Sequence, residues 1–413
     1  MSFSYGRAIR AIPGPSMIPD RVLNAMHQAA PNIYEGELVE LTGTVRSDLR
    51  RVARTEGAVA IYIGNGHAMW EASLANMARP GERILVLLTG RFGRGWAETA
   101  RRLGIEVETI DFGFRGAVEP GRIEDHLRAD ADRRIRAVLT TQTDTASSAL
   151  TDIRAVRAAI DAAGHPALLA VDCVASLAAD RFEMDAWGVD VMISACQKGL
   201  MTPPGLGFTF QSDKAMAEGV PCPSPYWDWR PRSKPGLFYE LFHGTAPTHH
   251  LFGLREALDM ILLEEGLGNV WARHAVFARA VAAAVEAWGR AGALELNIPA
   301  APARSYAVTT IRTGPGEAGR IRAWCEEIAG VTLGIGLETP GVDPSSMFRI
   351  AHMGHLNPPT LLGTLATVET ALDALGIAHG PGAVEAASRV IAAADRERAR
   401  GGAESVERRI AIG

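Results

Sequence analysis

Short apolar runs alternate with longer helical patterns through the first two-thirds of the chain. The runs at 59–63, 84–88, 137–139, 167–171 and 189–193 have the length and composition of buried strands. Helical patterns over 69–78, 95–103 and 153–163 lie between them. Continuously apolar strands that alternate with helices indicate a mainly parallel sheet covered on both faces. We therefore predict an α/β fold in which a ligand binds at the carboxyl ends of the strands.

The pattern changes to long helices from about residue 251. Helical patterns cover 251–267, 270–291, 317–329 and 359–375, and strands are expected at 306–311 and 347–350. This order of elements is typical of a smaller α+β domain. We predict four parts: an N-terminal arm (1–20), a large domain (21–265), a small C-terminal domain (266–378) and a charged, helix-prone tail (379–413). The apolar positions of the tail either dock on the body or a partner, or belong to an exposed, frayed helix.

Composition and charge place the chain among ordinary globular proteins. Of its 413 residues, 47% are hydrophobic and 22% charged, and 42 Lys and Arg against 47 Asp and Glu give a net charge of −5. No run rich in Lys or Arg is present, which argues against nucleic acid as the main partner. The first residues lack the apolar core of a signal peptide, and no apolar stretch approaches the ~20 residues of a membrane helix. We therefore expect a soluble, cytoplasmic protein without a membrane partner.

Neither a metal site nor a disulfide framework is expected. The four cysteines lie far apart and include no Cys-x-x-Cys pair. The histidines at 249–250 and at 352 and 355 have a spacing that suits a metal, but no carboxylate or cysteine completes a ligand set. We interpret them as core or interface histidines.

Polar or small residues follow several predicted strands, and the first such turn is Gly64-Asn65-Gly66-His67. Small residues between a strand and a helix let backbone amides approach an anion, which the helix dipole also favours. Met69 occupies the third glycine position of a dinucleotide fingerprint, and the next strand lacks a suitable acid at its end. A phosphate site and a tight turn both remain open, whereas a nicotinamide-dependent dehydrogenase would have only an incomplete fingerprint.

An acid and a lysine follow two further strands. Asp172 ends the strand 167–171, and a carboxylate there is costly unless it pairs with a cation or several donors. It is either a cap or salt bridge, or a fixed partner for a cationic group in the cleft. Lys198 precedes a Gly/Pro-rich turn, and an amine held in the cleft loses its proton more easily and can form a Schiff base. A surface lysine is the alternative.

These features become informative together. An anion-binding helix start, an acid that keeps a ring nitrogen protonated and a Schiff-base lysine are the groups that pyridoxal phosphate requires. They occur in that order along the chain. A hydroxyl-rich turn at 143–148 follows another strand and by itself predicts only a cap for the helix near Asp152.

Two segments around the acid and the lysine resemble class V aminotransferases: 168–177 (LLAVDCVASL) and 194–205 (SACQKGLMTPPG). The nearest subgroup is the alanine/serine–glyoxylate aminotransferases, and the resemblance covers about residues 13–375. It implies PLP fold type I, with a mainly parallel sheet in a large domain and a smaller C-terminal α+β domain. It also implies a homodimer with shared active sites. The expected activity is transamination, dependent on pyridoxal phosphate, between a small amino acid (serine, alanine or aspartate) and glyoxylate or pyruvate.

The resemblance assigns roles by position. Lys198 would hold the cofactor and move the proton, and Asp172 would pair with the ring nitrogen. The other cofactor-binding positions are Asn65, Gly66 and His67 in the phosphate loop, Gln197 at the phosphate, Phe92 and Val174 at the ring, Thr145 as a hydroxyl contact, and Thr245, lent to the neighbouring subunit's phosphate. Arg349 would grip the substrate carboxylate with a bidentate fork, and Tyr34 would border the substrate.

Departures from the family pattern keep alternatives open. Phe242 replaces a tyrosine that some relatives use on the phosphate, so one hydrogen bond is expected to be missing. The turn 34–37 (YEGE) replaces a His-Arg-Ser segment, and its acids resemble the pyridoxamine–pyruvate aminotransferase branch. Asn65 and His67 instead follow the cofactor-retaining pattern.

Two further alternatives concern single segments. A lyase or cysteine desulfurase can use the same scaffold, but a desulfurase needs a cysteine on a mobile loop and Cys325 lies in a helical pattern. Trp227 and Trp229, in the Pro-rich segment 221–235, either roof the cleft or belong to a packed loop.

Overall fold

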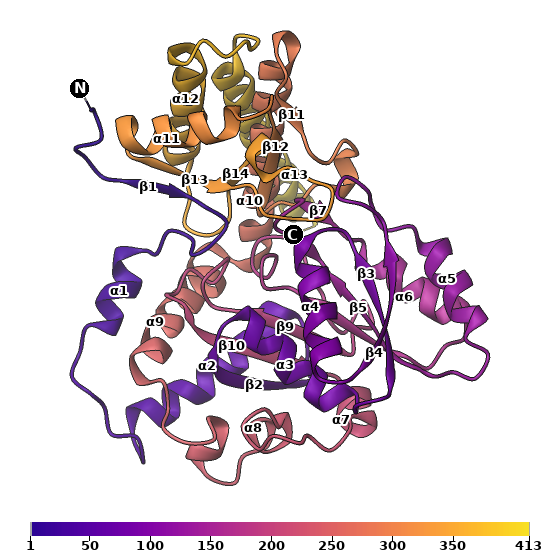
Figure 1. The fold of residues 1–413 in the computed structure, drawn as a ribbon. Helices are drawn as coiled ribbons and strands as arrows, with labels where there is room; N and C mark the ends of the chain where they lie inside the picture. The colour runs from indigo at the N-terminus through magenta and orange to yellow at the C-terminus, as the bar shows by residue number, and fades with distance from the viewer. Residues whose placement is uncertain (1, 413) are drawn as a thin grey trace.

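A seven-stranded sheet forms the centre of the larger part of the molecule in the computed structural model, which describes residues 2–412, with side chains up to residue 400 (Figure 1). In spatial order its strands are β2 (Ala58–Gly64), β10 (Gly205–Gln211), β9 (Val191–Ala195), β8 (Leu168–Asp172), β5 (Ile135–Thr141), β3 (Arg83–Leu88) and β4 (Glu106–Asp111). All neighbours are parallel except β10, which runs antiparallel to β2 and β9. The predicted α/β fold with a mainly parallel sheet is confirmed.

Both faces of this sheet are buried, which explains why its strands are continuously apolar. In β8, Leu169 and Val171 face one hydrophobic cluster, and Leu168 and Ala170 face the other, because successive side chains of a strand point to opposite faces. Helices α2 (Glu37–Ala53), α5 (Pro120–Ala129), α6 (Ile153–Ala162) and α9 (Thr248–Asp259) cover the first face, and α3 (Gly66–Met77) and α4 (Arg91–Arg102) the second. The five predicted strands and three predicted helices are all present.

Two strands of this sheet have no apolar run. The edge strand β4 has the sequence EVETID, and only Ile110 in it is buried, so its charged positions interrupt any apolar run. Strand β10 is buried but contains two glycines, and a Cβ at Gly207 would lie 2.7 Å from the sulfur of Met69. The glycine lets the Met69 side chain of helix α3 pack closely on β10.

A second sheet forms the smaller part of the molecule, above the first in Figure 1. Its strand order is β1 (Ile9–Ala11), β13 (Val331–Ile335), β14 (Met347–Ala351), β12 (Val308–Arg312) and β11 (Glu295–Leu296). Helices α10 (Leu267–Trp288), α11 (Glu317–Ala329) and α12 (Pro358–Ala374) bury its apolar side. The division of the chain into four parts stays a prediction, although β1, within the expected arm, belongs to this sheet.

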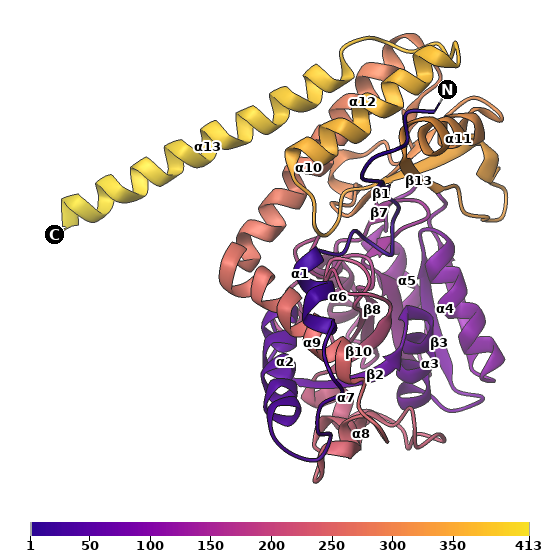
Figure 2. The same cartoon turned by 90° about the vertical axis from the view of Figure 1, so that its left-hand side faces the viewer.

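The tail forms one long helix, α13 (Ala383–Ile412), whose first turns dock on the body. Ala383 and Ala387 are fully buried and Val390 packs against the same cluster, which includes α10. Beyond these turns the helix leaves the body, as Figure 2 shows. None of the helices in the described part of the chain is both long and apolar enough to cross a membrane.

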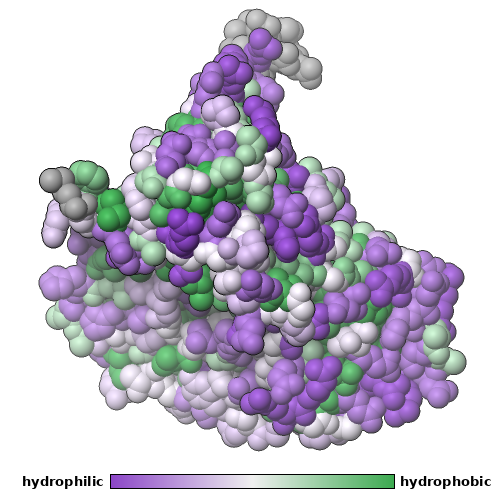
Figure 3. Space-filling view, turned by 45° about the horizontal axis from the view of Figure 1, so that its top comes forward, coloured by the Kyte–Doolittle hydropathy of each residue, from purple (hydrophilic) through white to green (hydrophobic). Residues whose placement is uncertain are grey.

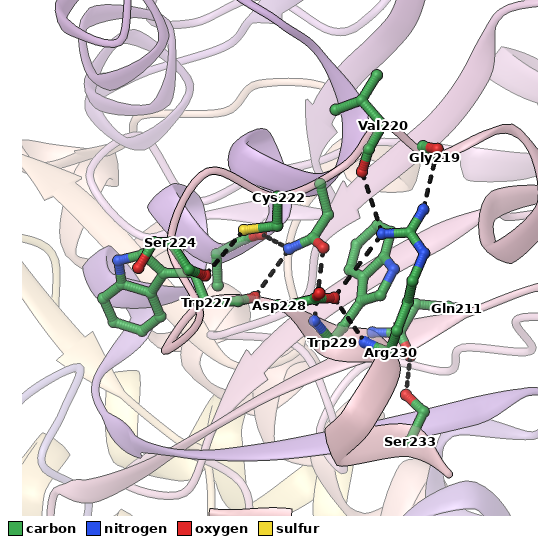
Figure 4. A network of polar contacts seen from close by, with 12 residues as sticks. Gln211, Gly219, Val220, Cys222, Ser224, Trp227, Asp228, Trp229, Arg230 and Ser233 are labelled. Carbon is green, nitrogen blue, oxygen red and sulfur yellow. Dashed lines mark hydrogen bonds and ion pairs between the residues drawn. The ribbon is translucent and has the colours of Figure 1, made fainter. Parts of the chain in front are cut away.

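The segment 221–235 is a packed loop rather than a roof over the cleft. Asn76 in α3 donates a hydrogen bond to the Trp227 carbonyl (2.8 Å), and Trp229 is fully buried. Arg230 donates to the backbone carbonyls of Gly219 and Val220, just before this segment (Figure 4). On the face seen in Figure 3 hydrophilic side chains predominate, and hydrophobic ones occur in small groups.

Candidate active site

A cavity of about 250 Å³ lies where the carboxyl edge of the large sheet meets the small sheet. Many of the lining residues end or follow one of five strands: β2, β3, β5, β8 and β9. They lie together because the carboxyl ends of parallel strands meet at the same edge of a sheet. The lining residues are Pro13, Gly14, Gly66, His67, Trp70, Phe92, Thr143, Thr145, Asp172, Val174, Ala175, Gln197, Lys198, Leu337 and Arg349. The structure therefore brings together most of the residues predicted from the sequence.

The start of α3 is fixed by a side-chain cap and by close packing. Asn65 Oδ1 accepts hydrogen bonds from the backbone N–H groups of His67 (3.1 Å) and Ala68 (3.3 Å), so its side chain is used as an N-cap. A Cβ at Gly66 would lie 2.9 Å from Val174 Cγ2, which explains the glycine at the first helical position. Asn65 itself does not line the cavity, although the helix start that it holds does.

Asp172 is buried at the end of β8 and is held by two donors. The Val174 N–H donates to Oδ1 (2.8 Å), and the Trp70 indole Nε1–H donates to Oδ2 (2.8 Å). Burial raises the pKa of Asp172 to about 6, and these two hydrogen bonds oppose the rise. No Lys or Arg within the described side chains forms an ion pair with it, so the salt-bridge alternative is excluded.

Lys198 points into the cavity, three residues after β9 ends. Its ammonium donates a hydrogen bond to the Pro13 carbonyl, and any side chain at Gly14 would overlap it. Burial lowers the pKa of Lys198 to about 8, and the charge of Arg349 acts in the same direction. A substantial fraction of the amine is therefore neutral near pH 8, which makes it a nucleophile and a base. The surface-lysine alternative does not hold.

Arg349, on β14, reaches the cavity from the small sheet with only 6% of its surface exposed. Its Nε donates to the Ile335 carbonyl (2.7 Å), and Nη1 donates to the Thr145 carbonyl (2.8 Å). Burial lowers the pKa of Arg349 to about 10. Neither Glu35 nor Glu37 pairs with it, and both are exposed. A buried guanidinium held only by carbonyls retains the charge that attracts a carboxylate.

Aromatic rings and a carboxylate shape the remaining wall. The rings of His67, Trp70 and Phe92 form one cluster, in which the Trp70 centroid lies 4.4 Å from that of His67 and 6.3 Å from that of Phe92. The buried Asp144 carboxylate accepts hydrogen bonds from the N–H groups of Phe92 (2.7 Å) and Ala146 (2.9 Å), and so anchors the start of α4 to the turn that carries Thr145. No sequence pattern indicated Asp144 as a separate site residue.

Besides Asn65, two predicted residues do not line the cavity. Tyr34 is 85% exposed, and Thr245 is exposed on the segment before α9. Conversely, sequence reasoning missed Trp70, which stands three residues after His67 on the same helix face; helical spacing from a predicted site residue could have found it. Pro13 and Gly14 come from the N-terminal segment, and no local pattern indicates that they cover Lys198.

A lysine with a lowered pKa, a buried acid and an arginine held only by carbonyls meet at the carboxyl edge of an α/β sheet, an arrangement suited to amine chemistry on carboxylate-bearing substrates. Residues 13–339 match the profile of the family described as aminotransferase class V, and the chain belongs to this family.

Similar proteins agree with this assignment. The chain is 38% identical over 392 residues to a serine–glyoxylate aminotransferase of Methylorubrum extorquens, covering 93% of this chain and 95% of that protein. It is 34% identical over 370 residues to an L-aspartate–glyoxylate aminotransferase of Paracoccus denitrificans, covering 89% and 91%. The crystal structure of pyridoxamine–pyruvate aminotransferase from Mesorhizobium loti superposes with a TM-score of 0.85 at 28% identity, covering 95% and 100%. The chain is an aminotransferase of PLP fold type I, as the sequence predicted.

Replacing Arg349 by Lys is expected to weaken substrate binding. Lysine keeps the charge but loses the planar fork, so the KM of both amino donor and oxo acid should rise at least about tenfold, the scale of a charged hydrogen bond of ~1.5–3 kcal/mol. Steady-state kinetics beside a thermal melt measures this. Arg312→Lys, on neighbouring β12 and paired with Glu295 (3.2 Å), is the matched control. Unchanged KM values with a lowered Tm would assign Arg349 to structure instead.

Proposed function

We propose that this aminotransferase uses pyridoxal phosphate to move the amino group of a small amino acid, serine, alanine or aspartate, to glyoxylate or pyruvate. The observation that carries the proposal is the convergence of Lys198, Asp172 and Arg349 on one cavity. The names of the similar serine– and aspartate–glyoxylate aminotransferases support the choice of substrates.

The lining residues fit this cofactor. Lys198 would hold its aldehyde carbon, and Asp172 its ring nitrogen; Phe92 and Val174 would flank the ring. The phosphate would meet the helix start that Asn65, Gly66 and His67 form, together with Gln197 and the Thr145 hydroxyl. Gln197 Oε1 is buried without a hydrogen-bond partner among the described residues, as expected of a polar group that a bound molecule completes. When bound, the cofactor supplies an electron sink for the substrate's α carbon.

The side chains of the chain itself supply the rest of the mechanism. Arg349 binds and orients the substrate carboxylate, which places the α carbon beside Lys198. With its lowered pKa, the Lys198 amine takes the α proton and later returns one. Asp172, ionised above a pKa of about 6, keeps a proton on the ring nitrogen. The donor leaves as a 2-oxo acid, and the acceptor takes the amino group.

We further infer a homodimer with shared active sites. Thr245 and Tyr34 are exposed and line no part of the cavity of their own chain. A second copy would use Thr245 at its phosphate and Tyr34 at its substrate.

A second candidate function is the pyridoxamine–pyruvate reaction. The similarity to the Mesorhizobium loti enzyme and the acidic turn 34–37 favour it. Nothing favours a desulfurase, because Cys325 is buried in α11 and burial raises its pKa to about 12.

A direct test is the spectrum of the purified protein. The bound cofactor should give a visible absorbance band that borohydride removes by reducing the bond to Lys198, one of only three lysines in the chain. Peptide mapping then identifies the labelled lysine. Half-reactions with serine, alanine, aspartate and free pyridoxamine separate the two candidate functions. Retained cofactor and reaction with amino acids support transamination between an amino acid and an oxo acid. Reaction with pyridoxamine alone supports the pyridoxamine–pyruvate reaction.

Lys198→Ala is expected to abolish transamination and leave the fold intact, because the amine serves chemistry rather than packing. Lys214→Ala, which removes an amine that donates to the Pro166 carbonyl outside the cavity, is the matched control. Turnover and thermal melting of both variants provide the measurement. Turnover above about one hundredth of wild type would contradict the assignment, since a covalent catalyst and base should contribute more than the ~10²-fold of a single base.

Uptake of pyridoxal phosphate by the cofactor-free protein should depend on pH. The lowered pKa of Lys198, about 8 instead of 10.5, means that the neutral, attacking amine increases through pH 8 and then levels off. Stopped-flow absorbance between pH 6 and 10 follows this rate (limits chosen about two units either side of that pKa). A rate that still climbs steeply at the upper limit would indicate a solvent-exposed lysine.

Asp172→Asn should keep bound cofactor but slow proton abstraction strongly. A neutral amide cannot hold the ring nitrogen as a cation, so the electron sink weakens. Single-turnover reaction with an amino acid measures this step separately from product release. A wild-type rate would make Asp172 a structural acid.

A further inference from the structure

Trp70 differs from four other tryptophans of the described chain in the hydrogen bonding of its indole nitrogen. Its Nε1–H donates to Asp172 Oδ2 at 2.8 Å, and the side chain is 4% exposed. By contrast, the indole nitrogens of four other tryptophans are buried without a partner: Trp96, Trp229, Trp271 and Trp288. The bond to Asp172 is therefore not a general consequence of burying an indole in this protein.

The Asp172 carboxylate is fixed through both of its oxygen atoms. Val174 N–H holds Oδ1 from the loop after β8, and Trp70 holds Oδ2 from α3, a separate element. With the indole donor alone removed, one oxygen would lose its partner, and the carboxylate could rotate about its Cβ–Cγ bond. A catalytic side chain needs such supporting bonds to keep a productive orientation.

The surrounding sequence makes room for the indole at this place. A Cβ at Gly95 in α4 would lie 2.8 Å from two carbons of the Trp70 six-membered ring, so a side chain there would have to displace the indole. His67 packs against the ring edge-on at 4.4 Å. The indole also lines a neighbouring hollow of about 680 Å³ that includes Arg91, and with His67 and Phe92 it forms part of the wall between this hollow and the site.

We propose that Trp70 is a positioning residue of the active site, whose indole N–H holds the Asp172 carboxylate ionised and oriented toward the ring nitrogen of bound pyridoxal phosphate. This inference rests on the proposed function. A donor to a carboxylate stabilises its charged form, and the Trp70 bond lowers the pKa of Asp172 against the effects of burial and of the nearby Asp144 charge. The charge of Lys198 acts in the same direction as the indole.

The test compares Trp70→Phe with Trp96→Phe in the full chain. Both changes keep an aromatic ring, but only the first removes a partnered N–H; Trp96 is fully buried on α4 and its Nε1 bonds to nothing among the described residues. Each protein is loaded with pyridoxal phosphate or with its N-methyl analogue, whose ring nitrogen is permanently cationic. The rate of the half-reaction with amino acid and the dissociation constant of each cofactor are measured.

With pyridoxal phosphate, Trp70→Phe should react about 10- to 100-fold more slowly than wild type, the scale of a hydrogen bond to a charged group, and bind the cofactor more weakly. With the N-methyl analogue, the variant should react at nearly the rate of wild type carrying the same analogue, because the ring charge no longer depends on Asp172. Trp96→Phe should match wild type with either cofactor. Gly95→Ala displaces the indole without removing it, so it should also slow the half-reaction with pyridoxal phosphate and restore the rate with the N-methyl analogue. This variant replaces Trp70→Phe in the test if Trp70→Phe does not fold.

The outcomes separate the two proposals. If wild-type protein forms no borohydride-sensitive bond at Lys198, the proposed function itself fails. If it does, and Trp70→Phe reacts and binds cofactor like wild type, the role of Trp70 is overturned. Slow reaction that the N-methyl analogue does not restore would also overturn it, because the indole would then act only through packing.

Discussion

Three ionisable side chains, the buried Asp172 and Arg349 and the half-buried Lys198, line one cavity without a partner of opposite charge, and the structure of the site depends on this arrangement. Removing a charge from water is costly unless protein groups replace the water. Here neutral groups do so: an indole and a backbone amide for Asp172, one carbonyl for Lys198 and two carbonyls for Arg349. Burial shifts each pKa in the direction that favours the neutral form: to about 6 for Asp172, to about 8 for Lys198 and to about 10 for Arg349. The charges thus remain available for a ligand instead of being consumed in salt bridges.

Such an arrangement requires a scaffold that does not relax around it. The large sheet provides this rigidity, because its central strands are buried on both faces and their carboxyl ends cannot move independently. Asp144 adds a second constraint, since its buried carboxylate ties the start of α4 to the turn that holds Thr145. Arg349 then bonds the Thr145 carbonyl from the small sheet. The site therefore exists only when both sheets are in place. A further link between the two parts is the hydrogen bond that the Tyr306 N–H donates to Asp180 Oδ1 (2.6 Å).

Sequence patterns predicted much of the fold and part of the site. Continuously apolar strands identified the parallel sheet, and the positions of Asp172 and Lys198 after such strands indicated side chains at its carboxyl edge. Strand β10 escaped because two glycines interrupt its apolar pattern, and β4 because an exposed edge strand carries charges. Trp70 escaped because an apolar residue on a helix usually packs in a core, and its contact with Asp172 crosses 102 positions of sequence.

By itself the sequence determined the class of fold, the family and the chemical types available, because strand burial and local motifs are encoded within short windows. Only the tertiary structure decided how those groups are protonated and supported. The pKa values of Lys198 and Arg349 depend on burial between two sheets, and the cover over Lys198 comes from Pro13 and Gly14, far away in the chain. Electrostatic effects of this kind arise from the distances and the desolvation that folding creates, and no local pattern of residues records them.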